Sequence, residues 1–144
     1  MAAPALNEFW KLVKNPGRPT IYKPDELWKK AVEYFTWVNK NPLYEQKVFG
    51  TGLSMKVPKM RAMTEMAFCL FAGISHDTFL NYKSNKEPYK DFFVVSSKIS
   101  QVIYCQKFEG AAAEFLNANI IARDLGLSEK TDHNITTNDV DFTF

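Results

Sequence analysis

The chain has 144 residues, of which 46% are hydrophobic and 15% aromatic, which is enough to form one core and argues against a disordered protein. The amino terminus lacks the apolar run of a signal peptide, and no segment approaches the roughly 20 apolar residues of a membrane span, so we expect a soluble, intracellular protein. The net charge is +2, but residues 1–123 carry 17 basic and 11 acidic side chains, whereas residues 124–144 carry one basic and five acidic. A basic body favours a polyanionic partner, although an ordinary mixed surface explains the same charge.

Residues 1–24 contain four prolines and four basic side chains, and we predict that they form an extended basic arm. Within the arm, only Glu8–Val13 has the pattern of a short helical turn. Lys11, Lys14 and Arg18 are candidate DNA contacts, because basic side chains neutralise phosphates. The alternative is that these side chains form a solvated surface.

A helical core is predicted over residues 25–127. Its first helix opens at Pro24, followed by two carboxylates that favour the positive end of the helix dipole. Apolar residues then recur every three or four positions until Asn41 and Pro42, at Leu27, Trp28, Ala31, Tyr34, Phe35 and Val38. This pattern predicts a helix with one buried face.

The period changes to two in the next segment, which predicts a β-hairpin over about residues 46–58. Leu53, Met55 and Val57 alternate with polar residues, and Gly50 and Gly52 mark the turn. We expect Pro58 to end the second strand. A lone hairpin is marginal in water, so it should pack on helices or on another subunit.

Residues 60–72 and 75–83 are predicted to form two helices joined by Gly73 and Ile74, in the manner of a helix-turn-helix. Ser75 is the expected cap of the second helix, while Phe79 and Tyr82 should pack back on the first. The side chains expected to be exposed, and hence the candidate DNA contacts, are His76, Asn81, Lys83 and Lys86. The alternative is a purely structural corner.

A long helical region is predicted from Pro88 to Leu125, with Phe92, Val95, Ile99, Val102 and Ile103 on its buried side. We expect Gly110 to kink or divide this region, and Gly126 to supply the left-handed residue after its end. The fold class is therefore mainly α.

No catalytic motif is recognisable, so we expect a non-enzymatic protein that needs no cofactor. The phosphate-binding glycine motif of ATPases is missing, and two histidines with two separate cysteines make no zinc pattern. Cys69 and Cys105 both lie in apolar stretches, and we expect two buried free thiols.

Several segments resemble, in order along residues 1–127, the small terminase subunit of tailed bacteriophages that package double-stranded DNA by a headful mechanism. They are Met1–Pro4, Glu33–Phe35, Trp37–Val38, Asn41–Leu43, Lys59–Thr64, Gln101–Tyr104, Gln106–Phe108, Gly110–Ala113 and Leu116–Leu127. The resemblance implies a mainly helical protomer with a β-hairpin, assembled into a closed and commonly nonameric ring in the host cytoplasm. Such a ring has no catalytic residues. It recognises the packaging-initiation site of the viral DNA and delivers the DNA to the large terminase, which holds the ATPase and nuclease.

Two other classes remain open from the residues alone. One is a dimeric helix-turn-helix transcriptional regulator, and the other is a structural ring or adaptor without DNA binding. The mass of the assembly distinguishes the first from a packaging ring, and salt-dependent DNA binding distinguishes the second.

The tail, residues 128–144, departs from the relatives, whose tails are basic and bind DNA. Here the tail is acidic, and Val140, Phe142 and Phe144 alternate with polar residues. Three outcomes are open: a strand in a small barrel formed by the ring, an anchor for the large terminase, or a frayed end.

Overall fold

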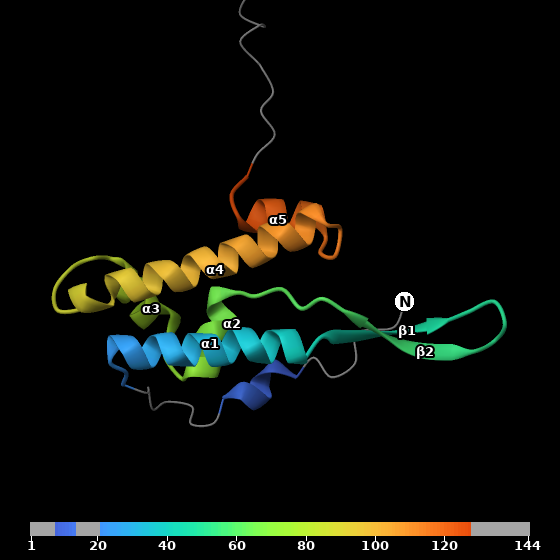
Figure 1. Ribbon diagram of the computed structural model, residues 1–144, viewed down its shortest axis with the longest axis horizontal. Helices are drawn as coiled ribbons and strands as arrows, with labels where there is room; N and C mark the ends of the chain where they lie inside the picture. Colours follow the sequence, from blue (N-terminus) through green and yellow to red (C-terminus); the bar gives the residue numbers. More distant parts are fainter. Residues whose placement is uncertain (1–7, 14–20, 128–144) are drawn as a thin grey trace, which may run out of the picture.

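The computed structural model describes residues 8–13 and 21–127, and helices dominate this part of the chain (Figure 1). In chain order the elements are η1 (Phe9–Leu12), α1 (Pro24–Lys40), β1 (Leu43–Val48), β2 (Ser54–Lys59), α2 (Glu65–Ala72), α3 (His76–Lys83), η2 (Lys90–Phe92), α4 (Phe93–Ala112) and α5 (Ala118–Asp124). The mainly α class with one hairpin is confirmed, as is the short turn in the arm, which is a 3₁₀ helix.

Helix α1 forms for the reasons that its sequence predicts. Pro24 stands in the first turn, and the Glu26 carboxylate accepts a 2.8 Å hydrogen bond from the Lys23 amide. The buried side is a stripe at Leu27, Ala31, Tyr34 and Val38. The helix stops at Asn41, whose side-chain amide donates to the Trp37 carbonyl at 2.8 Å.

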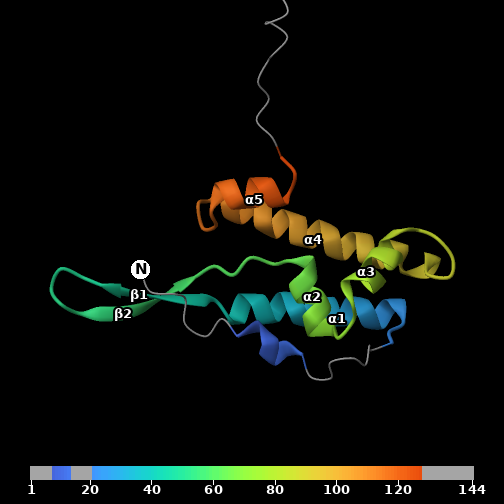
Figure 2. The same ribbon diagram turned by 180° about the vertical axis from the view of Figure 1, so that it is seen from behind.

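The hairpin projects beyond the helices, as both views show (Figures 1 and 2). Its strands are antiparallel, with Leu43 opposite Lys59 and Val48 opposite Ser54. The predicted start is wrong, because β1 begins three residues earlier, at Leu43. Pro58 does not end β2 but lies inside it, one residue before its end at Lys59. A proline is tolerated there because both strands of a two-stranded sheet are edge strands.

Helix α2 begins at Glu65, and the predicted start at residue 60 is wrong. Thr64 is its cap, accepting a 3.0 Å hydrogen bond from the Ala67 amide. The residues before it are extended because Gln106 of α4 binds their backbone: its side chain accepts from the Met63 amide and donates to the Arg61 carbonyl, both at 3.0 Å. A contact across more than forty residues thus overrides the local helical pattern.

Gly110 does not divide the long helix. It lies within α4, and the break follows at Ala113–Asn117, where Glu114 has a φ of 64°. The lack of a side chain at Gly110 serves packing instead, since a Cβ there would lie 2.6 Å from the Leu116 Cδ1 atom. Asn117 caps α5 by accepting from the Ile120 amide at 3.1 Å, and the left-handed Gly126 is confirmed with a φ of 74°.

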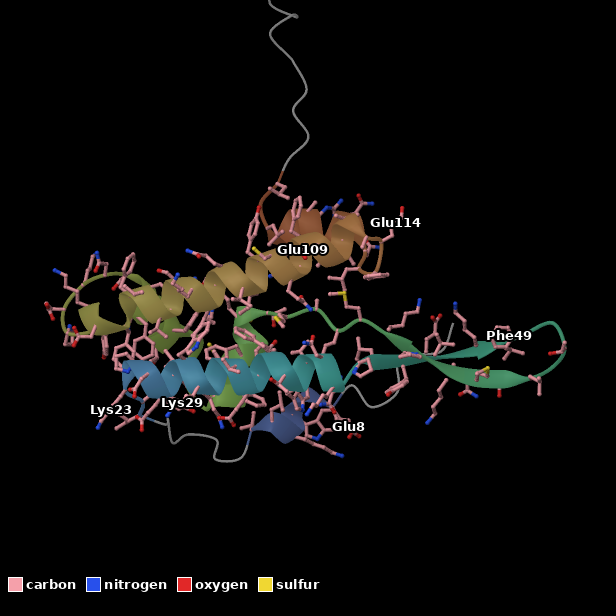
Figure 3. All side chains as sticks on the ribbon, viewed as in Figure 1. Glu8, Lys23, Lys29, Phe49, Glu109 and Glu114 are labelled. Carbon is pink, nitrogen blue, oxygen red and sulfur yellow. The ribbon has the colours of Figure 1, made fainter. Side chains whose placement is uncertain are left out.

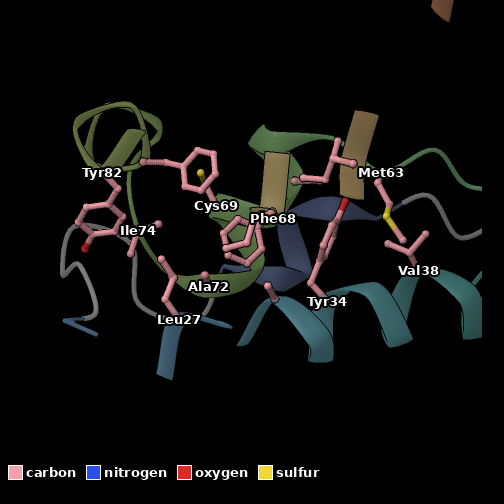
Figure 4. Packing of buried hydrophobic residues seen from close by; sticks show 14 residues of the cluster. Leu27, Tyr34, Val38, Met63, Phe68, Cys69, Ala72, Ile74 and Tyr82 are labelled. Atoms are coloured by element: carbon pink, nitrogen blue, oxygen red, sulfur yellow. The ribbon is translucent and has the colours of Figure 1, made fainter. Parts of the chain in front are cut away.

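Aromatic rings fill the core between α1, α2, α3 and α4 (Figure 4). Tyr34 and Phe79 each pack on Phe68, with ring centroids 5.7 and 5.6 Å apart. The Thr64 amide donates to the Tyr34 hydroxyl at 3.1 Å, so the one polar atom of this ring has a partner. Cys69 is buried as expected, but the expectation for Cys105 is wrong: it is exposed, because it lies on the outer side of α4.

Candidate nucleic-acid interface

Helices α2 and α3 form the predicted corner. Gly73 follows α2 with a left-handed φ of 77°, and its amide donates to the Cys69 carbonyl at 2.9 Å. Ser75 caps α3 by accepting from the Thr78 amide at 3.0 Å. Phe79 and Tyr82 are buried against the core. The order of helix, glycine turn, cap and second helix is therefore confirmed.

The outer side of α3 exposes fewer of the candidate DNA contacts than the sequence predicted. Asn81 is exposed, as expected, whereas His76 and Lys83 are half-buried. The expected exposure of these two side chains is therefore wrong. Residues that are distant in the sequence cover these two side chains, and the local pattern of α3 cannot reveal such contacts.

Lys83 ties three helices together. Its ammonium lies 2.9 and 3.1 Å from the two carboxylate oxygens of Glu65 on α2, and 5.3 Å from the centre of the Phe79 ring. Ser100 on α4 donates to the same carboxylate at 2.8 Å. The charge of Lys83 is thus partly neutralised within the protein.

Lys86 is exposed in the loop after α3, and so are Lys90 and Lys98, which were not among the residues predicted from the sequence. Within residues 21–127, none of these three lysines forms an ion pair. The loop folds back on α3, because Tyr82 packs on Tyr89 and stacks on Phe92 at 4.1 Å. Lys90 and Lys98 could have been predicted from the sequence, because they follow Lys86 at short spacing in and after the predicted loop. The loop after α3 lies at the end of the protomer opposite the hairpin (Figure 1), and Asp77, Glu87 and Asp91 are also exposed around it.

The arm is described only in part. Lys11 is exposed and forms an ion pair of 2.5 Å with Glu8, while Trp10 beside it is exposed. Helix η1 lies against α2, so this part of the arm is placed on the body. Lys14 and Arg18 lie outside the described residues, as do Val140, Phe142 and Phe144 of the tail.

A cleft of about 560 Å³ lies where α2, α4 and α5 meet near the start of α3. His76, Lys107 and Asp124 contribute to its wall. Lys107 is buried and its ammonium is paired with the Asp124 carboxylate, which fastens α5 to α4. The candidate DNA contact His76 and the Lys107–Asp124 ion pair therefore line the same cleft.

Two further observations concern the described residues alone. Among residues 8–13 and 21–127, no three His, Cys, Asp or Glu side chains are grouped so that they could hold a metal ion. In that part of the chain, no helix is both long and apolar enough to cross a membrane.

The chain is similar to known proteins over most of its length. Residues 17–133 match the family described as DNA-packaging protein gp3. Over 135 residues the chain is 45% identical to the protein named "Terminase, small subunit" of Salmonella phage P22, covering 91% of this chain and 81% of that relative. The chain belongs to this family of phage DNA-packaging proteins, the terminase small subunits, and the resemblance found in the sequence is confirmed.

Proposed function

We propose that this chain is the non-catalytic small subunit of a viral DNA-packaging terminase, acting in the host cytoplasm as a closed, nonameric homo-oligomer. It binds double-stranded viral DNA at the packaging-initiation site, delivers the DNA to the large terminase and regulates that enzyme. The observation that carries the proposal is the 45% identity to a terminase small subunit over most of both chains.

The lysines around the end of α3 supply the DNA contacts in this proposal. Lys86, Lys90 and Lys98 surround the end of α3 without ion pairs among the described residues, so their charges remain for phosphates. Asn81 is the exposed side chain of α3 suited to a base edge, and His76 stands at the start of α3. Lys83 orients α3 through Glu65 and adds a weaker charge.

A salt series of binding to phage DNA tests this surface. We expect the double variant Lys86→Gln/Lys90→Gln to bind more weakly and to lower the slope of log affinity against log salt by about 2, or about 1 for each lost phosphate contact. Lys47→Gln/Lys56→Gln on the hairpin is the matched control and should bind like the parent. Parent-like binding by the first variant, or an equal loss in the control, contradicts this placement.

The arm is the second basic element of the proposal. Lys11, Lys14 and Arg18 are three basic residues of the arm, and replacing all three with Gln should also flatten the salt dependence. If this triple variant and the Lys86→Gln/Lys90→Gln variant both bind like the parent, DNA binds elsewhere.

The acidic tail is proposed to bind the large subunit, with Val140, Phe142 and Phe144 as apolar anchors. Deletion of residues 134–144 should leave the assembly intact and abolish binding of the large terminase. Loss of the assembly would show that the tail builds the ring instead, and unchanged binding of the large subunit would leave the tail without this role.

A further inference from the structure

Helix α4 is apolar on two opposite sides. Ile99 and Ile103 are buried in the core, whereas Tyr104 and Phe108 are exposed and stack on each other, with ring centroids 6.3 Å apart and planes 5° from parallel. Contiguous apolar patches on a surface mark sites of contact with other proteins. No described element of the protomer buries the Tyr104 and Phe108 rings.

The exposed rings continue on to the next segment. Phe115 in the turn and Ile120 on α5 are 68% and 64% exposed. Helix α5 is fixed on α4 by the Lys107–Asp124 ion pair and by Leu116, which packs over Gly110. With Tyr104 and Phe108, these side chains leave on the order of 400 Å² of apolar surface uncovered, about half of what one partner contributes to a stable interface. We call this the α4–α5 face.

A second apolar surface lies on the other side of the protomer. In both views α5, α4, α1 and η1 follow one another across the molecule (Figures 1 and 2). Trp28 and Val32 on α1 and Trp10 on η1 are exposed. The Trp28 ring is held in place by an edge contact with Phe35 at 6.2 Å. We call these residues the α1–η1 face.

The net charge beside each of the two faces is small, and its sign differs: residues 23–40 carry four lysines and three acidic side chains, whereas residues 107–124 carry two basic and three acidic side chains. Glu109 and Glu114 lie on the side of α4 and α5, while Lys23 and Lys29 lie on the side of α1 (Figure 3). None of these four charged side chains has an ion-pair partner in the described part of the chain. Opposite charge on two faces of one chain favours contact between unlike faces, because like faces would bring Glu109 and Glu114 against themselves.

We propose that the α4–α5 face of one copy of this chain packs against the α1–η1 face of the next copy, an inference that rests on the proposed homo-oligomer and names its interface. A contact between two different faces on opposite sides repeats from subunit to subunit. The series of subunits ends only when it closes into a ring.

Two double variants of the full chain, each with one face disabled, test the proposal by native mass spectrometry. Phe108→Glu/Ile120→Glu lacks the α4–α5 face, and Trp28→Gln/Val32→Glu lacks the α1–η1 face. Each variant alone should be monomeric at a concentration at which the parent is fully assembled. Their mixture should give a one-to-one heterodimer and nothing larger, because each partner retains one intact face.

The outcomes separate this interface from the proposed function. An assembled parent with either variant still forming the parent oligomer overturns the interface, as does a mixture without heterodimer. Self-dimerisation of Trp28→Gln/Val32→Glu would show contact between like faces. A monomeric parent would overturn the proposed ring itself.

A second pair of variants is independent of core packing. Lys29→Glu and Glu109→Lys/Glu114→Lys change only exposed charges, so folding, checked by circular dichroism, should be preserved. Each should raise the protein concentration needed for assembly by about tenfold, and mixing the two should restore part of the loss. No change in assembly with either variant overturns the role of these charges and with it the choice of unlike faces.

Discussion

Apolar side chains are buried in the helical core and exposed in the β-hairpin. In the core, Leu27, Phe68 and Phe79 have no exposed surface. In the hairpin, Val48, Leu53 and Met55 are each more than half exposed, and Phe49 stands near the projecting tip (Figure 3). The hairpin is joined to the body through its base, where Lys59 forms a 3.1 Å ion pair with Glu45.

This difference shows that the apolar content of the chain exceeds what one folded copy requires. The core is complete within the protomer, since its rings contact one another and its buried hydroxyl is hydrogen-bonded. The hairpin and the α4–α5 face are not covered by the described part of the chain. Changes to the core should therefore alter the stability of the fold, and changes to the hairpin tip should not.

The largest effect is expected from Phe68→Ala. Removing a fully buried ring that contacts Tyr34 and Phe79 should lower the free energy of unfolding by about 3–5 kcal/mol. Phe49→Ala is the control, with an expected change within about 0.5 kcal/mol. Urea unfolding at low protein concentration measures both. An equal loss at Phe49 would mean that the hairpin belongs to the core.

The core should also lose stability at alkaline pH. Burial raises the pKa of the Cys69 thiol from 9.0 to about 12, and burial likewise raises the pKa of Tyr34. Because the folded pKa of Cys69 is the higher one, its contribution is fully present below pH 9 and disappears as the pH rises to about 12. The loss from Cys69 is up to about 4 kcal/mol.

Urea unfolding at pH 8 and pH 10.5 measures this loss. Cys69→Ala should show a shallower decrease than the parent, whereas Cys105→Ala, at an exposed position, should decrease like the parent. Equal slopes for the parent and Cys69→Ala would contradict the buried thiol.

A smaller effect is expected at Gly110, the point where the α4–α5 turn closes. A Cβ there would lie 2.6 Å from Leu116 and 2.9 Å from the Met60 Cε atom, and this overlap outweighs the better helix propensity of alanine. Gly110→Ala should cost about 1–2 kcal/mol in urea unfolding. Gly50→Ala in the hairpin turn meets open space and should be close to neutral. A stabilised Gly110→Ala would show that Leu116 is not packed there.

Local signals in the sequence were sufficient for much of the fold. The α1 stripe and the Gly73–Ser75 corner depend on residues within a few positions of one another, and both are confirmed. The errors come from contacts between distant residues. Gln106 keeps the residues before Glu65 extended, and Leu116 gives Gly110 a packing role instead of a kink.

In the candidate site, too, local patterns were predicted correctly and contacts between distant residues were not. The exposure of Asn81 and Lys86 follows from the period of α3 and the loop after it. The burial of Lys83 depends on Glu65, eighteen residues away, and no periodicity reveals such an ion pair. The exposed rings of α4 were not predicted either. The apolar pattern of a helix does not show which of its sides the rest of the protomer covers.

Native mass spectrometry of the full-length chain at micromolar concentration tests the central claim most directly, since a packaging ring and a single-copy protein differ most in mass. The account predicts one homogeneous, closed assembly, and nine copies of the 16.6 kDa chain weigh about 149 kDa. A monodisperse monomer or dimer under the same conditions would contradict the account.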